Sequence, residues 1–156
     1  MACGIIWRLL RRLDDKNYGL DVFEAMVAPA ILESFATGDI CVIKACRGMV
    51  WDTKSGADIL IRSGMLSALL GHMASANMRA RAKACWTVAA ITERSRPNVH
   101  CVVEAGIYPV LLQLMRSDNH STRVRASREI FSVISCRGEK VMRYLCDISI
   151  VNALCT

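Results

Sequence analysis

The chain has 156 residues, of which 53% are hydrophobic and 6% aromatic, with three Pro and a net charge of +6. This length predicts one domain that buries its own core, and the composition excludes a disordered tail or a Pro-rich linker. The longest stretch without a charged residue, 63–78, is too short and too polar to span a bilayer. The dispersed basic excess favours acidic partners without choosing their class.

The first segment, 3–14, carries apolar residues at helical spacing with arginines between them. Trp7 and Trp86 lie at nearly equal distances before a Glu-Ala pair that recurs later in the chain. We therefore interpret 3–14 as the third helix of an incomplete repeat over 1–17.

Three copies of one pattern follow. Residues 103–115 match 61–73 at a shift of 42, with Gly, Leu-Leu and Met at the same places. Residues 24–35 match 104–115 and share Glu-Ala and a Pro. This recurrence predicts an array of helical repeats. The repeats are placed at about 18–54, 55–96 and 97–138, with partial repeats at 1–17 and 139–156.

Each copy has the same internal plan: a short helix, a sharp turn, a second helix, a polar turn and a longer third helix. Gly64 and Gly106 suit the sharp turn, because Gly tolerates the left-handed conformation at a helix end. The predicted helices are 18–26, 29–37, 39–52, 56–62, 66–75, 78–94, 98–104, 108–117 and 121–136. The expected core positions are Ala84, Val88, Ile91, Leu112, Ser127, Phe131 and Ile134.

The order short, short, long, with a Gly between the first two helices, resembles the armadillo repeat. Residues 104–114 look like that family's turn and second helix, and 86–91 look like the core of its third helix. The resemblance covers about 18–146. It implies an all-α, right-handed α-solenoid of about three armadillo repeats, forming a single domain over 1–156. HEAT repeats, with a similar period and two helices per unit, are the alternative.

The resemblance also implies a concave ladder of third helices that holds an extended peptide. In 78–94, Lys83, Trp86 and Ala90 lie on a second face, away from the buried stripe. Their equivalents in the next third helix are placed at Ala126, Glu129 and Val133. Trp combined with Arg and Lys is the composition of a binding hot spot, although Trp packed between repeats and solvated cations are the opposing interpretation. The candidate partner-binding residues are Trp7, Arg11, Lys44, Arg47, Trp51, Lys83 and Trp86.

Importin-alpha-like repeats place an Asn four residues after the third-helix Trp. In this chain the residue four positions after Trp86 is Ala90. The basic surface instead resembles the beta-catenin type, which takes acidic segments. We therefore expect a protein–protein interaction scaffold that binds an extended acidic segment, in the cytoplasm or alternatively the nucleus. The alternative function is binding of RNA or another nucleic acid, which salt should weaken steeply. Membrane attachment is expected only if Cys3 is acylated, and exposed end repeats predict some self-association.

The sequence has no Gly-x-Ser-x-Gly, phosphate-cradling loop or His-Glu-x-x-His motif. We expect no enzyme activity, no cofactor and no metal. The eight Cys show no C-x-x-C pair, and we interpret them as buried thiols in a reducing compartment. Cys46 and Cys85 are predicted to occupy the same packing position in successive repeats.

Overall fold

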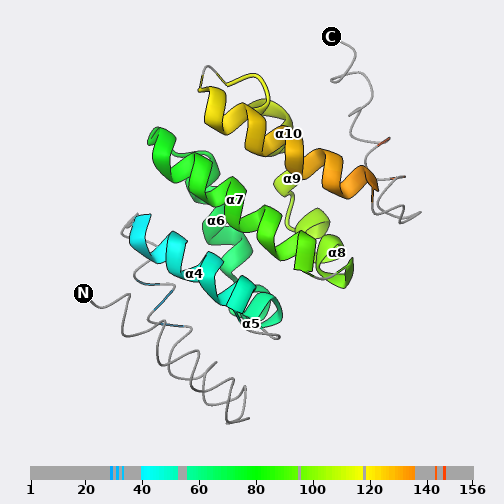
Figure 1. The fold of residues 1–156 in the computed structure, drawn as a ribbon. Helices are drawn as coiled ribbons and strands as arrows, with labels where there is room; N and C mark the ends of the chain where they lie inside the picture. Colours follow the sequence, from blue (N-terminus) through cyan, green and yellow to red (C-terminus); the bar gives the residue numbers. More distant parts are fainter. Residues whose placement is uncertain are drawn as a thin grey trace.

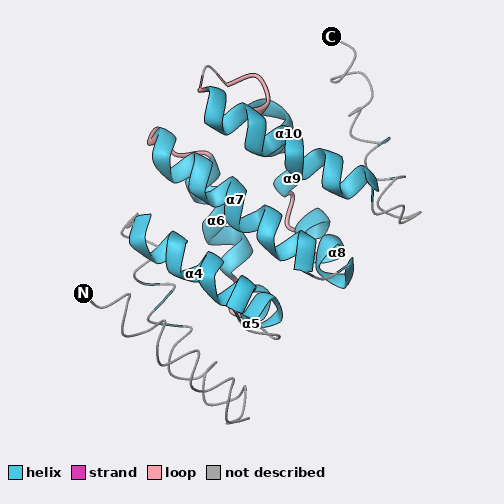
Figure 2. Cartoon of the chain, in the orientation of Figure 1, coloured by secondary structure: helices cyan, strands magenta, loops and turns pink. Residues whose placement is uncertain are grey.

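The computed structural model of the chain describes residues 40–52, 56–94, 96–117 and 119–135, together with single residues at 29, 31, 33, 143 and 146. Over the four ranges the chain is all-α, with seven helices and no strand (Figure 2). None of these helices combines the length and the apolarity needed to cross a bilayer. The helices are α4 (Ile40–Asp52), α5 (Gly56–Arg62), α6 (Met65–Met73), α7 (Met78–Arg94), α8 (Arg96–Glu104), α9 (Ile107–Leu114) and α10 (His120–Ser135).

The helix boundaries follow the predicted plan within a few residues. From α5 to α7, and again from α8 to α10, two short helices precede a long one. The predicted partial repeat at 1–17 and the predicted first helix at 18–26 lie outside the described residues. The predicted partial repeat at 139–156 lies outside them too, apart from the single residues 143 and 146.

The sharp turn has the same backbone geometry in both triplets. Gly64 has φ 80° and Gly106 has φ 71°, in the left-handed region that a residue with a Cβ rarely adopts. The backbone N–H of Gly64 donates to the Ile61 carbonyl at 3.1 Å, and that of Gly106 donates to the Val103 carbonyl at 3.0 Å. The first helix of each triplet therefore ends where Gly allows the chain to reverse.

The polar turn before each of α7 and α10 is held by an Asn cap. The Asn77 Oδ1 accepts from the backbone N–H of Arg79 at 3.0 Å, and the Asn119 Oδ1 accepts from that of Thr122 at 2.9 Å. These bonds satisfy amide groups that a helix N-terminus leaves without an intrahelical acceptor.

An Arg on the following helix closes the same turn from the other side. The Arg81 Nη1 donates to the Ser75 carbonyl at 2.7 Å, and the Arg123 Nη1 donates to the Ser117 carbonyl at 2.8 Å. Each of these Arg and Ser residues has its counterpart 42 positions away, as do the two Asn caps. The two turns therefore use the same Ser, Asn and Arg residues at the same spacing.

The three long helices lie side by side, with α7 between α4 and α10 (Figure 1). Behind them, α6 packs against α7, and α9 packs against α10. The predicted stripe of Ala84, Val88 and Ile91 on α7 is confirmed as buried. The core continues through Leu69 and Leu111 of the second helices. Within the described residues, α7 therefore packs against α4, α6, α8 and α10.

The predicted buried stripe on α10 was wrong. Phe131 is 71% exposed, and Ser127 and Ile134 are only partly buried. Buried instead are Thr122, Ala126, Glu129 and Ile130. Ala126 and Ile130 lie 42 residues after Ala84 and Val88, so the pattern of α7 recurs on α10 at that shift. The prediction was displaced by one residue, which rotates the expected face by about 100°.

Two further core predictions had mixed outcomes. Leu112 is half-buried, whereas its neighbour Leu111 is fully buried, because α9 points Leu111 at the core. Cys46 and Cys85 are buried, as predicted. Cys41 and Cys146 are exposed, so the interpretation of every thiol as buried was wrong for them.

Candidate functional site

The candidate site lies over α7, with α4 and α10 on either side. Of the predicted residues, Lys44, Arg47 and Trp51 come from α4, and Lys83 and Trp86 come from α7. Trp7 and Arg11 lie outside the described residues. Ala90 was expected on the same face but is buried.

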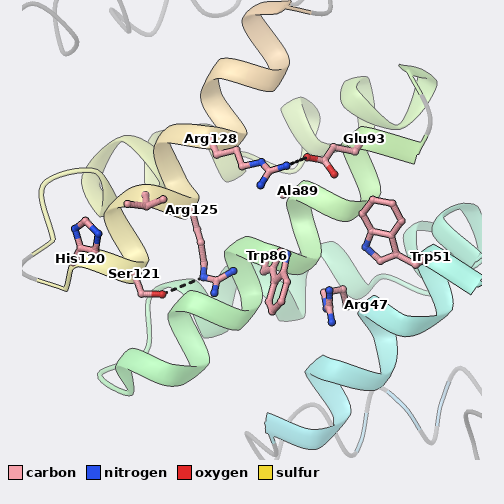
Figure 3. A pocket seen from close by; sticks show the side chains of 10 residues that line it. Arg47, Trp51, Trp86, Ala89, Glu93, His120, Ser121, Arg125 and Arg128 are labelled. Carbon is pink, nitrogen blue, oxygen red and sulfur yellow. Dashed lines mark hydrogen bonds and ion pairs between the residues drawn. The ribbon is translucent and has the colours of Figure 1, made fainter.

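The indole of Trp86 is the centre of a cation cluster. The Arg47 Cζ lies 3.7 Å from the ring centroid, the Arg125 Cζ lies 4.3 Å from it, and the Lys83 Nζ lies 4.7 Å from it. Figure 3 shows Trp86 between Arg47 and Arg125, so one ring from α7 joins groups from α4 and α10. Each such contact contributes about 0.5–1 kcal/mol when exposed and more when desolvated.

Arg125 is the site residue that the sequence reasoning missed. It lies 42 residues after Lys83, at the equivalent place on the next long helix. The sequence alignment had instead placed Ala126 and Glu129 on this face, and both are buried. The turn residues Asn77 and Asn119, which share the same shift, carried the signal that would have corrected the register.

Two adjoining hollows cover this face. The first, which we name the cationic hollow, has a volume of ≈ 520 Å³ and lies toward the N-terminal ends of the long helices. It is lined by Ile40, Lys44, Met78, Arg79, Ala82, Lys83, Asn119, Ser121 and Arg125. Four of these side chains carry a positive charge and none is a carboxylate.

The second hollow, which we name the aromatic hollow, has a volume of ≈ 470 Å³. Figure 3 shows the side chains around it, with Trp51 and Trp86 on neighbouring helices. Ser121 and Arg125 line both hollows, so the two are contiguous. The lining residues are Arg47, Trp51, Trp86, Ala89, Glu93, His120, Ser121, Val124, Arg125 and Arg128.

The charges of the cationic hollow are crowded. Partial burial lowers the pKa of Lys83 most, and the nearby charges of Lys44, Arg125 and Arg47 lower it further. Among the described residues, no carboxylate forms an ion pair with any of these four cations. Arg47, which lines the neighbouring aromatic hollow, also has its Nε buried without a hydrogen-bond partner. An anion in the cationic hollow would relieve the repulsion among Lys44, Lys83 and Arg125.

The aromatic hollow has a different character. Trp51 is 44% exposed and Val124 is 51% exposed, so apolar surface faces solvent there. At its edge, Arg128 and Glu93 form an ion pair at 3.5 Å (Figure 3). The Arg94 Nε donates to the Val50 carbonyl at 3.2 Å. The Cζ of the same guanidinium lies 5.9 Å from the ring centroid of Trp51.

A buried carboxyl lies behind this face. The Thr92 Oγ1 donates to the Glu129 Oε1 at 2.7 Å, while the Glu129 Oε2 is buried without a hydrogen-bond partner. The pKa of Glu129 is raised to about 7, chiefly by burial. The Thr92 hydrogen bond lowers this pKa, and the charge of Glu93 raises it. This carboxyl is therefore a source of pH-dependent stability between α7 and α10.

The described residues hold no group of three or more His, Cys, Asp or Glu arranged to bind a metal. His120 is exposed and lines the aromatic hollow, whereas His72 and His100 lie on α6 and α8. The chemistry that this face offers is recognition of negative charge beside an apolar surface.

No family model matches the chain, and no curated protein matches it. Among solved structures, it is similar to the crystal structure of an engineered protein, with a TM-score of 0.61 and 16% sequence identity. The match covers 89% of this chain and 63% of the engineered protein, so the chain spans less than two thirds of that protein's length. At this identity the similarity concerns the fold alone.

Proposed function

We propose that the chain is a right-handed solenoid of about three armadillo-type repeats that holds an extended acidic segment of a partner protein across α4, α7 and α10. The repeat assignment is supported by the two short–short–long triplets. It is also supported by the matching Gly turns at Gly64 and Gly106 and the matching Asn caps at Asn77 and Asn119. The proposed repeats at 55–96 and 97–138 correspond to these two triplets, and α4 is the proposed third helix of the repeat at 18–54.

The observation that carries the function is the cationic hollow. Lys44, Lys83 and Arg125 come from three successive long helices and line one depression. Because no described carboxylate pairs with them, their charge is available to a partner. Like charges held this close destabilise one another, and a bound acidic segment removes that cost.

The Trp86 stack favours a peptide over a nucleic acid. Proteins that bind single-stranded nucleic acid stack bases on open aromatic rings. The ring of Trp86 is already stacked with Arg47 and Arg125 from its own fold, so of the two Trp rings around the aromatic hollow only that of Trp51 is open to a base. The stack also pre-orders the two guanidinium groups, which lowers the entropy lost when they bind carboxylates.

The test is equilibrium binding by fluorescence anisotropy, with a labelled Glu-rich peptide and a labelled single-stranded RNA measured in parallel. The variant pair Lys83→Met and Arg125→Gln removes two charges from the hollow. The matched control, Arg62→Gln with Arg116→Gln, removes two exposed charges that line neither hollow. Circular dichroism checks that both variants fold.

The proposal predicts that the wild type binds the peptide, that the hollow variant weakens binding on the order of tenfold or more, and that the control changes it little. Equal effects of the two variants would show that net charge alone drives binding, which contradicts a specific site. RNA binding that exceeds peptide binding and falls steeply with salt would contradict the peptide assignment.

A further inference from the structure

The aromatic hollow adjoins the cationic hollow, yet the acidic segment of the proposed function leaves it unused. It is lined by two large side chains with exposed surface, Trp51 and Val124, with Ala89 on α7 beside them. Exposed apolar surface of this kind, held in a concavity and rimmed by polar groups, marks a place where a partner's side chain docks.

We infer that the partner segment carries a large aromatic side chain which inserts into the aromatic hollow, beside the acidic residues held in the cationic hollow. This inference rests on the proposed function and specifies the partner further. A segment with both features engages two contiguous sites at once, because Ser121 and Arg125 line both.

The charges at the rim decide which part of the segment enters which hollow. Glu93 lines the aromatic hollow and repels a carboxylate there, and its ion pair with Arg128 neutralises one of the nearby cations. The cationic hollow has no carboxylate in its lining. Acidic side chains are therefore favoured in the cationic hollow over the aromatic one.

The rim also favours an aromatic ring over an aliphatic side chain. Arg47, Arg125 and Arg128 all line the aromatic hollow, and guanidinium groups interact with the face of an aromatic ring. Trp51 provides an aromatic neighbour as well, and pairs of aromatic rings gain more than their buried area alone provides. A Phe, Tyr or Trp of the partner thus gains contacts that Leu or Val lacks.

The distance between the acidic residues and the aromatic residue of the partner segment can be estimated from two positions on α7. Lys83 lines the cationic hollow, and Ala89 lines the aromatic hollow six residues later. A helix rises about 1.5 Å per residue, so the two positions are about 9 Å apart along the axis. An extended peptide advances about 3.3 Å per residue, so a segment that leaves the cationic hollow along α7 places its aromatic residue about three residues from the acidic ones.

The test uses three short labelled peptides that share one acidic run. The first has Phe about three residues from the run, the second has Ser in place of that Phe, and the third has Phe directly against the run. Anisotropy titrations with the wild type should show the first peptide binding at least about fivefold more tightly than the other two. Trp51→Ala should remove this preference, while Phe131→Ala, which alters an exposed aromatic residue outside both hollows, should preserve it.

The outcomes separate the inference from the function on which it rests. Equal binding of all three peptides, each weakened by Lys83→Met with Arg125→Gln, would overturn the aromatic site and leave the acidic-segment function standing. A preference for Phe that survives Trp51→Ala would also overturn the site. Failure of every peptide to bind the wild type would contradict the proposed function and the inference together.

Discussion

The guanidinium of Arg125, on α10, lies 4.3 Å from the ring centroid of Trp86, on α7. Because Arg47 of α4 approaches the same ring at 3.7 Å, one indole connects three consecutive long helices. The stack therefore contributes to the stability of the helix row as well as to the positive charge of this face.

Replacing Trp86 tests this structural contribution. We expect Trp86→Ala to lower the free energy of unfolding by about 2 kcal/mol, because it removes the guanidinium contacts and part of the packing between the helices. Trp86→Phe should cost about half as much, since a smaller ring still faces Arg47 and Arg125. Urea unfolding followed by circular dichroism measures both. The same loss for Phe and Ala would show that the aromatic face is unimportant.

The buried carboxyl of Glu129 predicts that stability falls as pH rises. Burial raises the pKa of Glu129 from 4.5 to about 7, so the folded state binds the proton more tightly than the unfolded state. The stabilisation is fully present below the unfolded value and is lost as pH rises through the folded one. The difference between pH 4.5 and pH 8 is on the order of 3 kcal/mol from this group.

Glu129→Gln isolates this effect, because it keeps the shape of the side chain and removes its charge. We expect the variant to be more stable than the wild type at pH 8 and nearly equal to it near pH 4.5. Urea unfolding at a series of pH values measures the difference. A wild type and a variant whose stabilities run parallel across this range would mean that the pKa of Glu129 is the same in the folded and unfolded states.

Two adjacent leucines on α9 differ in burial, so their replacement by Ala should lower the free energy of unfolding by different amounts. Leu111 is fully buried, so Leu111→Ala should destabilise the chain by about 3 kcal/mol through loss of buried area and a residual cavity. Leu112 is half-buried, and Leu112→Ala should cost about 1 kcal/mol because the site can relax toward solvent. Thermal and urea unfolding of the two variants compare them directly; a larger loss for Leu112 would place the core on the other face of α9.

The thiols of Cys41 and Cys85 should react at very different rates. Burial raises the pKa of Cys85 to about 12, so almost no thiolate exists there at neutral pH, and the side chain is inaccessible. Cys41 is exposed on α4. Alkylation of the native protein, mapped by peptide mass spectrometry, should label Cys41 and spare Cys85, while alkylation in urea should label both. Native labelling of Cys85 at the rate of Cys41 would contradict the packing of α7.

The sequence predicted the helices well because local chemistry determines their ends. Gly64 and Gly106 adopt the left-handed geometry that the turn requires, and Asn77 and Asn119 cap the helices that follow. These features act within a few residues of the chain, so they are visible in the sequence. The recurrence of the features at one spacing made the all-α class predictable as well.

The faces of α10 were harder to predict because a one-residue displacement turns a helix by about 100°. Aligning Trp86 with Glu129 left Arg125, the equivalent of Lys83, off the expected binding face. The same alignment assigned Phe131 to the expected core. The buried Glu129 accepts its hydrogen bond from Thr92, 37 residues away on another helix, and no local pattern distinguishes Glu129 from a surface Glu. The hollows likewise form only where three helices meet.

The most direct test of the central claim is a reversal of charge in the cationic hollow. The double variant Lys83→Glu with Arg125→Glu would be titrated with a Glu-rich and a Lys-rich peptide of equal length, beside the wild type and the control Arg62→Glu with Arg116→Glu. If the hollow selects acidic segments, the wild type and the control bind the Glu-rich peptide, whereas the double variant loses it and gains the Lys-rich one. A double variant that keeps the wild-type preference would contradict the claim that this face binds the partner.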